Sequence, residues 1–185
     1  MTNELVVVVD MQNDFLDGAL ANKAALDLVP KMAQMIKQEE AAGSIVLFTL
    51  DTHNAYYLET QEGKNLPVMH CIVGTEGHRV HKDLLAASTE KYRVEKPTFG
   101  MTTELWKETL YKYFYKLNEV KKVSLVGTVT SICVLNNALA LKALLPEVEI
   151  VVYEDLCADL NDEMQQATLK CLQASQVKVE KYFKD

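Results

Sequence analysis

The segment Leu5–Val9, with the sequence LVVVV, decides the fold of this chain. Five consecutive apolar residues, four of them β-branched, predict a strand buried on both faces, as in a parallel sheet covered by helices. A second run of this kind, residues 44–50 (SIVLFTL), follows a stretch with helical apolar spacing, residues 21–42, which ends at Gly43. The chain therefore begins with a predicted strand–helix–strand unit.

The same alternation continues to the end of the chain. Further strands are predicted at residues 92–95, 122–126, 148–153 and 177–180, and further helices at residues 102–117, 131–145 and 161–175. This order predicts an α/β fold of three layers, in which helices cover both faces of a six-stranded, parallel, doubly wound sheet. Because no repeat or linker interrupts the pattern, we expect residues 1–185 to form a single domain.

Composition excludes several classes of function. Acidic residues outnumber basic ones 26 to 19, for a net charge of −7, which disfavours binding to nucleic acid or to an anionic membrane. The apolar run at the start is too short to span a bilayer and lacks the flanks of a secretory signal. The four cysteines are widely spaced, without a Cys-x-x-Cys pair, so we expect reduced thiols and a cytoplasmic location.

Polar residues follow five of the predicted strands directly: Asp10, Asp51, Lys96, Gly127 and Asp155. Ligands of open α/β sheets bind at these strand ends. Cys133 lies where a helix is expected to begin, so the helix dipole would favour its thiolate, and backbone N–H groups of the same turn could hold an oxyanion. Asp10 could then take the thiol proton, with Lys96 as its electrostatic partner. The pattern also fits a structural Cys133, packed as a small apolar residue on the buried face of an Ala- and Leu-rich helix.

The segment between Asp51 and Val80 is long and has little periodicity, which is typical of a functional loop. It contains a set of carboxylate and imidazole side chains: Asp51, His53, Glu59, Glu62 and His70. Two imidazoles with one or two carboxylates suit Zn²⁺, Mn²⁺ or Fe²⁺. The same residues also fit a solvated loop, which is what we expect for His78 and His81 among their charged neighbours.

Six segments carry a family resemblance: residues 9–15 (VDMQNDF), 51–53 (DTH), 66–77 (LPVMHCIVGTEG), 96–100 (KPTFG), 127–134 (GTVTSICV) and 155–159 (DLCAD). In this order they resemble the isochorismatase-like superfamily of cysteine hydrolases, and within it the nicotinamidase-related amidases. The resemblance implies the same six-stranded parallel sheet. It also implies a catalytic triad in which Cys133 is the nucleophile, Asp10 the general base and later acid, and Lys96 the electrostatic partner.

The resemblance extends to the oxyanion hole and the metal. It implies a cis peptide bond between Thr128 and Val129, which would turn the Val129 N–H toward the oxyanion together with that of Cys133. It implies a divalent transition metal, zinc first and manganese or iron otherwise, whose ligands would be Asp51, His53, His70 and, as the fourth, Glu62. Glu59 is the other candidate for the fourth position. In such relatives the metal holds the ring nitrogen of nicotinamide.

The implied activity is the deamidation of nicotinamide, or of a similar small heterocyclic amide, through a thioester on Cys133, as in NAD salvage. Alternatives are a metal-free N-carbamoyl or ureidoacrylate-type amidase, an isochorismatase-type vinyl ether hydrolase, and a redox thiol module. Relatives of this kind also imply a homo-oligomer. The side chains expected to line an apolar pocket for a flat ring are Phe15, Leu66, Phe99 and Ile132.

Three positions depart from the family pattern, and all of them concern the substrate ring. Ser131 stands where an Asp is frequent, and Ile132 stands where some relatives have a polar side chain. Residues 66–69 lack the tryptophan that stacks on the ring in nicotinamidases. The single tryptophan of the chain, Trp106, lies in a predicted helix elsewhere.

Overall fold

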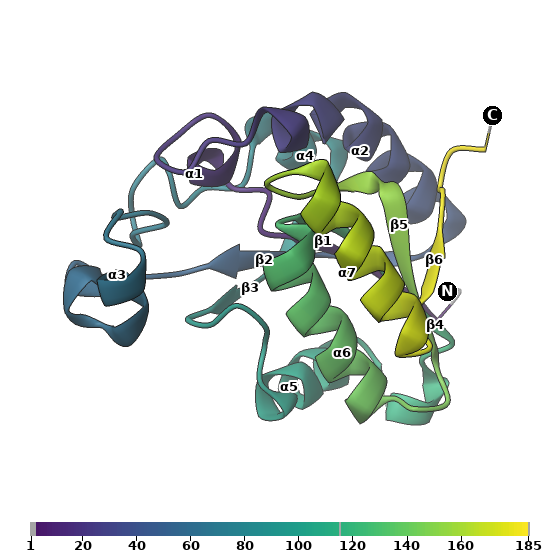
Figure 1. Ribbon diagram of the computed structural model, residues 1–185. Coiled ribbons are helices and arrows are strands. Elements are labelled where there is room, and N and C mark those ends of the chain that lie inside the picture. Colours follow the sequence, from purple (N-terminus) through teal and green to yellow (C-terminus); the bar gives the residue numbers. More distant parts are fainter. Residues whose placement is uncertain (1–2, 115, 185) are drawn as a thin grey trace.

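The computed structural model describes residues 3–114 and 116–184, which contain a six-stranded parallel sheet (Figure 1). The strand order is β3-β2-β1-β4-β5-β6. The strands are β1 (Glu4–Val9), β2 (Ile45–Asp51), β3 (Tyr92–Lys96), β4 (Lys122–Thr128), β5 (Glu149–Ala158) and β6 (Lys178–Glu180). Every pairing between these strands is parallel, and the order reverses direction between β1 and β4. The predicted doubly wound α/β fold is therefore confirmed.

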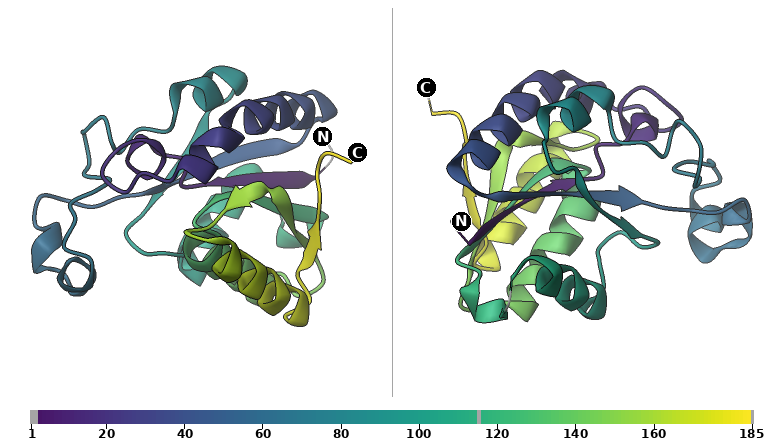
Figure 2. Two further views of the ribbon diagram at one scale, coloured as in Figure 1. Left: turned by 45° about the horizontal axis from the view of Figure 1, so that its top comes forward. Right: turned by 180° about the vertical axis from the view of Figure 1, so that it is seen from behind.

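Helices cover both faces of this sheet (Figures 1 and 2). One face packs against α1 (Asn13–Leu16), α2 (Lys23–Ala42) and α4 (Lys82–Ala87). The other face packs against α5 (Thr103–Tyr113), α6 (Leu135–Leu144) and α7 (Asp162–Ala174). Among the described residues, no helix combines the length and the apolar composition needed to cross a membrane.

Strand β1 contributes to both hydrophobic cores, as its continuous apolar sequence predicts. Leu5, Val7 and Val9 lie in the core beneath α5, α6 and α7, whereas Val6 and Val8 lie in the core beneath α2 and α4. Successive side chains of a strand point to opposite faces, so a strand buried on both sides requires apolar residues at every position.

Local signals set the limits of the longer helices. The Asn22 side chain accepts hydrogen bonds from the N–H groups of Ala24 and Ala25, and Gly43 ends α2 with a φ of 92°. The Thr102 side chain caps α5 in the same way, by accepting from the Leu105 N–H.

Some boundaries differ from those predicted. The helix expected over residues 102–117 ends at Tyr113, and the helix expected to begin at Ser131 is preceded by a π-helical turn, η3 (Thr130–Val134). Strand β5 continues to Ala158. The charged residues Glu154 and Asp155, which led to a predicted end at Tyr153, therefore lie within the strand. Helices as short as α1 and α4 have too few residues to show a helical period in the sequence.

The segment between β2 and α4 leaves the body of the domain (Figures 1 and 2). It contains the 3₁₀ turn η1 (Tyr57–Glu59) and the short helix α3 (Gln61–Asn65). Its returning part is tied to the segment after β1, because Asn13 N–H donates to Arg79 O at 2.9 Å and His81 N–H donates to Met11 O at 3.0 Å. This segment, residues 52–81, is called the excursion below, and these hydrogen bonds anchor it beside the carboxyl end of β1.

Candidate functional site

The candidate site lies at the carboxyl ends of four neighbouring strands, the edge strand β3 and the inner strands β2, β1 and β4. Asp10 follows β1, Asp51 ends β2, Lys96 ends β3, and Cys133 lies in the turn after β4. The strand order reverses between β1 and β4, and in open α/β sheets this reversal opens a crevice for ligands. The topology thus brings together residues that are far apart in the sequence.

Asp10 and Lys96 form a fully buried ion pair. Lys96 Nζ lies 2.7 Å from Asp10 Oδ2 and 3.7 Å from Asp51 Oδ1. Burial opposes the charge of Lys96, but the carboxylates of Asp10 and Asp51 raise its pKa, so it remains an ammonium. Burial raises the pKa of Asp10, an effect that Lys96 counteracts.

A hydroxyl group fixes the other oxygen of Asp10. Thr49 Oγ1 donates to Asp10 Oδ1 at 2.6 Å, and Thr49 is itself fully buried. Within the described residues, Asp10 Oδ2 accepts no hydrogen bond beyond its ion-pair contact with Lys96. This oxygen therefore has a lone pair available for a proton.

Cys133 lies in η3, beside Asp10, and is 6% exposed. Burial raises the pKa of its thiol well above the usual range, and the negative charge of Asp10 raises it further, whereas Lys96 opposes them. Burial and the neighbouring carboxylate therefore oppose the thiolate that a position at the start of a helix would favour, and Cys133 needs a base to take up its proton.

The turn before Cys133 has an unusual backbone. The Thr128–Val129 peptide bond is cis, and Gly127 has a φ of 124°. A Cβ atom at Gly127 would collide with the carbonyl oxygen of Val9 on the neighbouring strand. The Val129 carbonyl accepts from the N–H groups of Ile132 and Val134 at 3.2 Å, and no hydrogen bond within the described residues takes up the Val129 N–H. Val129 and Cys133 line the same cavity.

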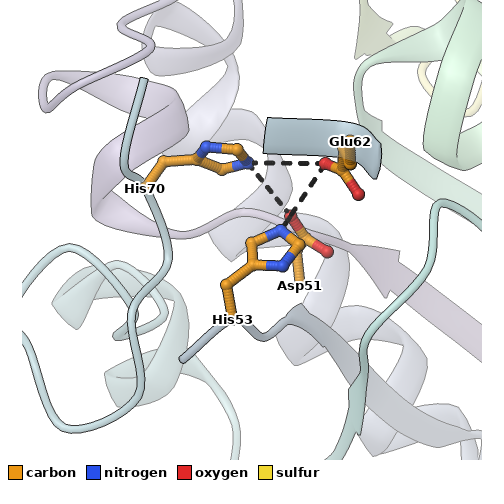
Figure 3. A group of neighbouring side chains, drawn as sticks. All are labelled: Asp51, His53, Glu62 and His70. Atoms are coloured by element: carbon orange, nitrogen blue, oxygen red, sulfur yellow. Dashed lines mark hydrogen bonds and ion pairs between the residues drawn. The ribbon is translucent and has the colours of Figure 1, made fainter. Parts of the chain in front are cut away.

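Four side chains of the excursion and of β2 converge on one point (Figure 3): Asp51, His53, Glu62 and His70. Asp51 Oδ2 lies 3.0 Å from His53 Nε2 and 3.4 Å from His70 Nε2. Glu62 Oε1 lies 3.6 Å from His53 Nε2 and 4.0 Å from His70 Nε2. All four candidate ligand atoms lie within 4.8 Å of one another. Glu59, the other candidate, is exposed and outside this cluster.

The cluster fits a divalent transition metal. Two ligand atoms bound to one tetrahedral zinc ion are about 3.4 Å apart, which is close to the spacings found here. His70 Nδ1 lies 2.8 Å from Val68 O and must donate to it, so His70 Nε2 is left as the nitrogen that can bind a metal. Burial opposes ionisation of Asp51, but hydrogen bonds from His53 and His70 and the charge of Lys96 lower its pKa. Asp51 is therefore a carboxylate.

His78 and His81 lie outside the metal cluster, but the expectation of two solvated side chains is wrong for His78. It is buried, and its Nε2 lies 2.8 Å from Thr52 Oγ1. His81 is the N-cap residue of α4, where its Nδ1 accepts from the Asp83 N–H. Charged neighbours in the sequence do not reveal that the His78 side chain is buried against Thr52.

A cavity of about 400 Å³ lies between Cys133 and three of the four candidate metal ligands. Its lining includes Cys133 and Val129 from the turn after β4, the candidate metal ligands Asp51, Glu62 and His70, and the four predicted pocket residues Phe15, Leu66, Phe99 and Ile132. No lysine or arginine is among the described residues that line it. A larger hollow of about 990 Å³ lies among charged side chains beside β3 and α4, but it contains no triad residue, so we assign the site to the smaller cavity.

Asp159, which the predicted strand ends do not include, contacts the turn that carries Cys133. Asp155 lies inside β5, and its carboxylate accepts from the backbone N–H groups of Tyr182 and Phe183 near the C-terminus. Asp159, which does follow the strand, accepts from Ser131 N–H at 2.7 Å and from Ser131 Oγ at 3.0 Å. The only signal for Asp159 in the sequence is its place in the family segment 155–159.

The fold and the site define a doubly wound α/β protein in which a thiol, a carboxylate and an ammonium meet at the reversal of strand order. Residues 4–181 match the isochorismatase domain, and the chain therefore belongs to the isochorismatase family. The family resemblance of the six sequence segments is thus confirmed. A comparison with curated protein sequences gives no match.

Solved structures share the fold over nearly the whole chain. A pyrazinamidase of Pyrococcus horikoshii in complex with zinc has 22% identity and a TM-score of 0.80, covering 97% of this chain and 99% of that one. A pyrazinamidase/nicotinamidase of Streptococcus mutans has 24% identity and a TM-score of 0.80, covering 95% and 99%. A nicotinamidase of Bacillus subtilis has 20% identity and a TM-score of 0.80, covering 97% and 99%.

Proposed function

We propose that this protein is a metal-assisted cysteine amidohydrolase that converts nicotinamide, or a similar small heterocyclic amide, to the acid and ammonia. The observation that carries the proposal is that a single cavity is lined by a nucleophilic group on one side and by candidate metal ligands on the other. The nucleophile turn (residues 129–133) lines one side, with the buried Asp10–Lys96 pair behind Cys133, and Asp51, Glu62 and His70 of the metal cluster line the other side. The names of the zinc-bound pyrazinamidase and of the nicotinamidases among the structural neighbours agree with this reading.

The triad residues account for the chemical steps. Asp10 accepts the thiol proton as Cys133 attacks the amide carbon, and the developing oxyanion is directed to the N–H groups of Val129 and Cys133. Asp10 then protonates the departing ammonia, which leaves a thioester on Cys133. Asp10 next takes a proton from water as the water attacks the thioester, and it returns this proton to the Cys133 sulfur as the C–S bond breaks and the acid leaves. Lys96 remains charged throughout and stabilises the Asp10 carboxylate.

The candidate metal ligands would position the substrate. Asp51, His53, Glu62 and His70 would hold the divalent metal, which when bound supplies a Lewis acid for a ring nitrogen of the substrate. The apolar side chains of Phe15 and Ile132 line the same cavity as this cluster and Cys133, and they suit the faces of a flat ring.

The charge of the cavity argues against the sister amidases. N-carbamoyl acids, ureidoacrylate and isochorismate all carry carboxylates, and a site for them needs a cationic partner. The cavity instead presents the carboxylates of Asp51 and Glu62, without a lysine or arginine among its described lining residues. A neutral amide is therefore favoured. The redox alternative needs a ready thiolate, whereas burial and Asp10 raise the pKa of Cys133.

An ammonia-release assay tests the proposal. Protein stripped by a chelator and reloaded with zinc is given nicotinamide, pyrazinamide and an N-carbamoyl amino acid, and metal content is measured by elemental analysis. We expect ammonia from the two heterocyclic amides, about one metal ion per chain, and loss of activity on chelation. Release from the N-carbamoyl compound alone, or full activity without metal, would contradict the proposal.

This activity also suggests a physiological setting. Deamidation of nicotinamide yields nicotinate for pyridine nucleotide synthesis. The four cysteines are free, which agrees with the reducing cytoplasm.

A further inference from the structure

The lining of the substrate cavity changes in exposure from its floor to its mouth. His70 and Cys133 at the floor are 2% and 6% exposed. Three large apolar side chains that also line the cavity are exposed instead: Leu66 at 37%, Phe99 at 45% and Leu160 at 68%. We refer to these three as the rim. Their exposure places them at the opening of the cavity, where their apolar surface contacts water.

The backbone of Leu160 is held in place although its side chain is exposed. Its N–H donates to Asp159 Oδ1 at 2.7 Å, and Asp159 is itself only 7% exposed. The other Asp159 oxygen accepts from the N–H of Ser131, two residues before the nucleophile, and the Asp159 carbonyl accepts from Asn22 Nδ2 at 3.0 Å. Leu160 therefore has a fixed position relative to Cys133.

The chemistry at the floor sets the direction of the substrate. The amide carbon must reach Cys133, and a ring nitrogen would face the metal cluster, so the edge of the ring remote from both points toward the mouth. An apolar substituent on that edge would cover the rim and remove its surface from water. A charged substituent would find no paired group there, because the rim is formed by leucine and phenylalanine.

We propose that the rim is a subsite for an apolar ring substituent, and that Leu160 is a specificity-determining residue for it. The inference rests on the proposed function and narrows its substrate class. The preferred substrates are neutral heteroaromatic amides with a short alkyl group on the ring edge remote from the amide group.

The test compares nicotinamide with 5-propylnicotinamide, which leaves the ring nitrogen unobstructed. We expect kcat/KM to be at least about tenfold higher for the propyl compound, since a few buried methylene groups discriminate by this order. Leu160→Ser should lower kcat/KM for 5-propylnicotinamide about tenfold more than for nicotinamide. The matched control is Met164→Ser, because Met164 is 46% exposed on α7 and outside the cavity lining, and it should change neither value.

Binding without turnover separates this inference from the proposed reaction. Calorimetry on zinc-loaded Cys133→Ala protein measures Kd for both amides, with and without Leu160→Ser. If neither amide is hydrolysed but the propyl compound binds more tightly and Leu160→Ser removes the difference, the subsite stands and the reaction is wrong. If nicotinamide is hydrolysed but the ratio between the amides does not respond to Leu160→Ser, the subsite is overturned and the reaction stands.

Discussion

Lys96 Nζ lies 2.7 Å from Asp10 Oδ2 with both side chains completely shielded from solvent. Lys96 ends β3 and Asp10 directly follows β1, and β2 lies between these two strands in the sheet. A buried pair of this kind gains little net stability over an apolar pair, but the loss of one partner leaves the other as an uncompensated charge. The pair is therefore better explained by chemistry than by stability.

Lys96→Met should destabilise the protein by roughly 3–5 kcal/mol, because Asp10 would lose its counter-ion in a buried site. Urea unfolding measures the change in free energy of unfolding. Lys23→Met is the matched control, since Lys23 lies 2.8 Å from Asp27 in an exposed i,i+4 pair and should cost less than about 1 kcal/mol. Equal effects of the two substitutions would show that the Lys96 ion pair is not desolvated.

Iodoacetamide at neutral pH should modify Cys171 and leave Cys133 unmodified, as measured by peptide mass mapping. Cys171 is exposed, whereas burial and the Asp10 carboxylate raise the pKa of Cys133. A thiol with a raised pKa gains thiolate only as pH rises, so modification of Cys133 should increase toward alkaline pH. Asp10→Asn should accelerate it by removing the neighbouring negative charge. Rapid modification of Cys133 at neutral pH in the unaltered protein would disprove this electrostatic account.

Cys133→Ala should abolish amide turnover while the circular dichroism spectrum and the unfolding transition stay close to those of the unaltered protein. The substitution removes one sulfur atom from the nucleophile turn and leaves the cavity open. Cys171→Ala, on the exposed side of α7, should retain full activity. Amidase activity that survives Cys133→Ala would end the assignment of the nucleophile.

His70→Ala should reduce bound zinc well below one ion per chain and remove the increase in Tm that zinc gives the unaltered protein. Ligand binding at 100-fold excess over Kd stabilises a fold by about 2.7 kcal/mol, so the shift in Tm is measurable. His81→Ala is the control, because His81 caps α4 outside the cluster and its loss should leave zinc stoichiometry unchanged. Full zinc binding by the His70→Ala protein would rule out the cluster as the metal site.

Gly127→Ala should be far more destabilising than Gly74→Ala. Both glycines have positive φ values, 124° and 83°, but a Cβ at Gly127 would collide with the Val9 backbone, whereas Gly74 has open space around it. Backbone strain alone costs about 1–2 kcal/mol, and overpacking raises the total at Gly127 to roughly 2–5 kcal/mol. Thermal or urea unfolding of the two variants gives the comparison, and similar losses would contradict the close approach of β4 to β1.

The sequence predicts the sheet well because each central strand is buried on both faces and therefore reads as a continuous apolar run. It predicts strand ends less well where a strand carries charges. Asp155 appears to follow β5, but its carboxylate is used to hold the backbone of Tyr182 and Phe183, so the charged pair lies within the strand. The residue that reaches the nucleophile turn is Asp159, four positions later.

Other features of the site depend on contacts that no local pattern encodes. Thr49 reaches Asp10 because β1 and β2 pair in a register that places Val9 opposite Thr49. The buried ring of Tyr57 packs against the rings of His53 and His70, with centroid distances of 4.6 and 4.9 Å, although its sequence neighbours do not indicate contact with the candidate metal ligands. The pKa of Cys133 is likewise a property of burial, which a helix-start argument does not include.

The path of the excursion has a consequence for protein engineering. Its outgoing and returning arms are paired directly, since His53 N–H donates to Cys71 O at 3.0 Å and Val73 N–H donates to His53 O at 2.9 Å. The helix α3 lies beyond this pairing and carries only Glu62 of the four candidate ligands. A chain nicked within α3 would therefore keep its two fragments associated across the sheet, and this makes α3 the natural place to divide the protein into complementing halves.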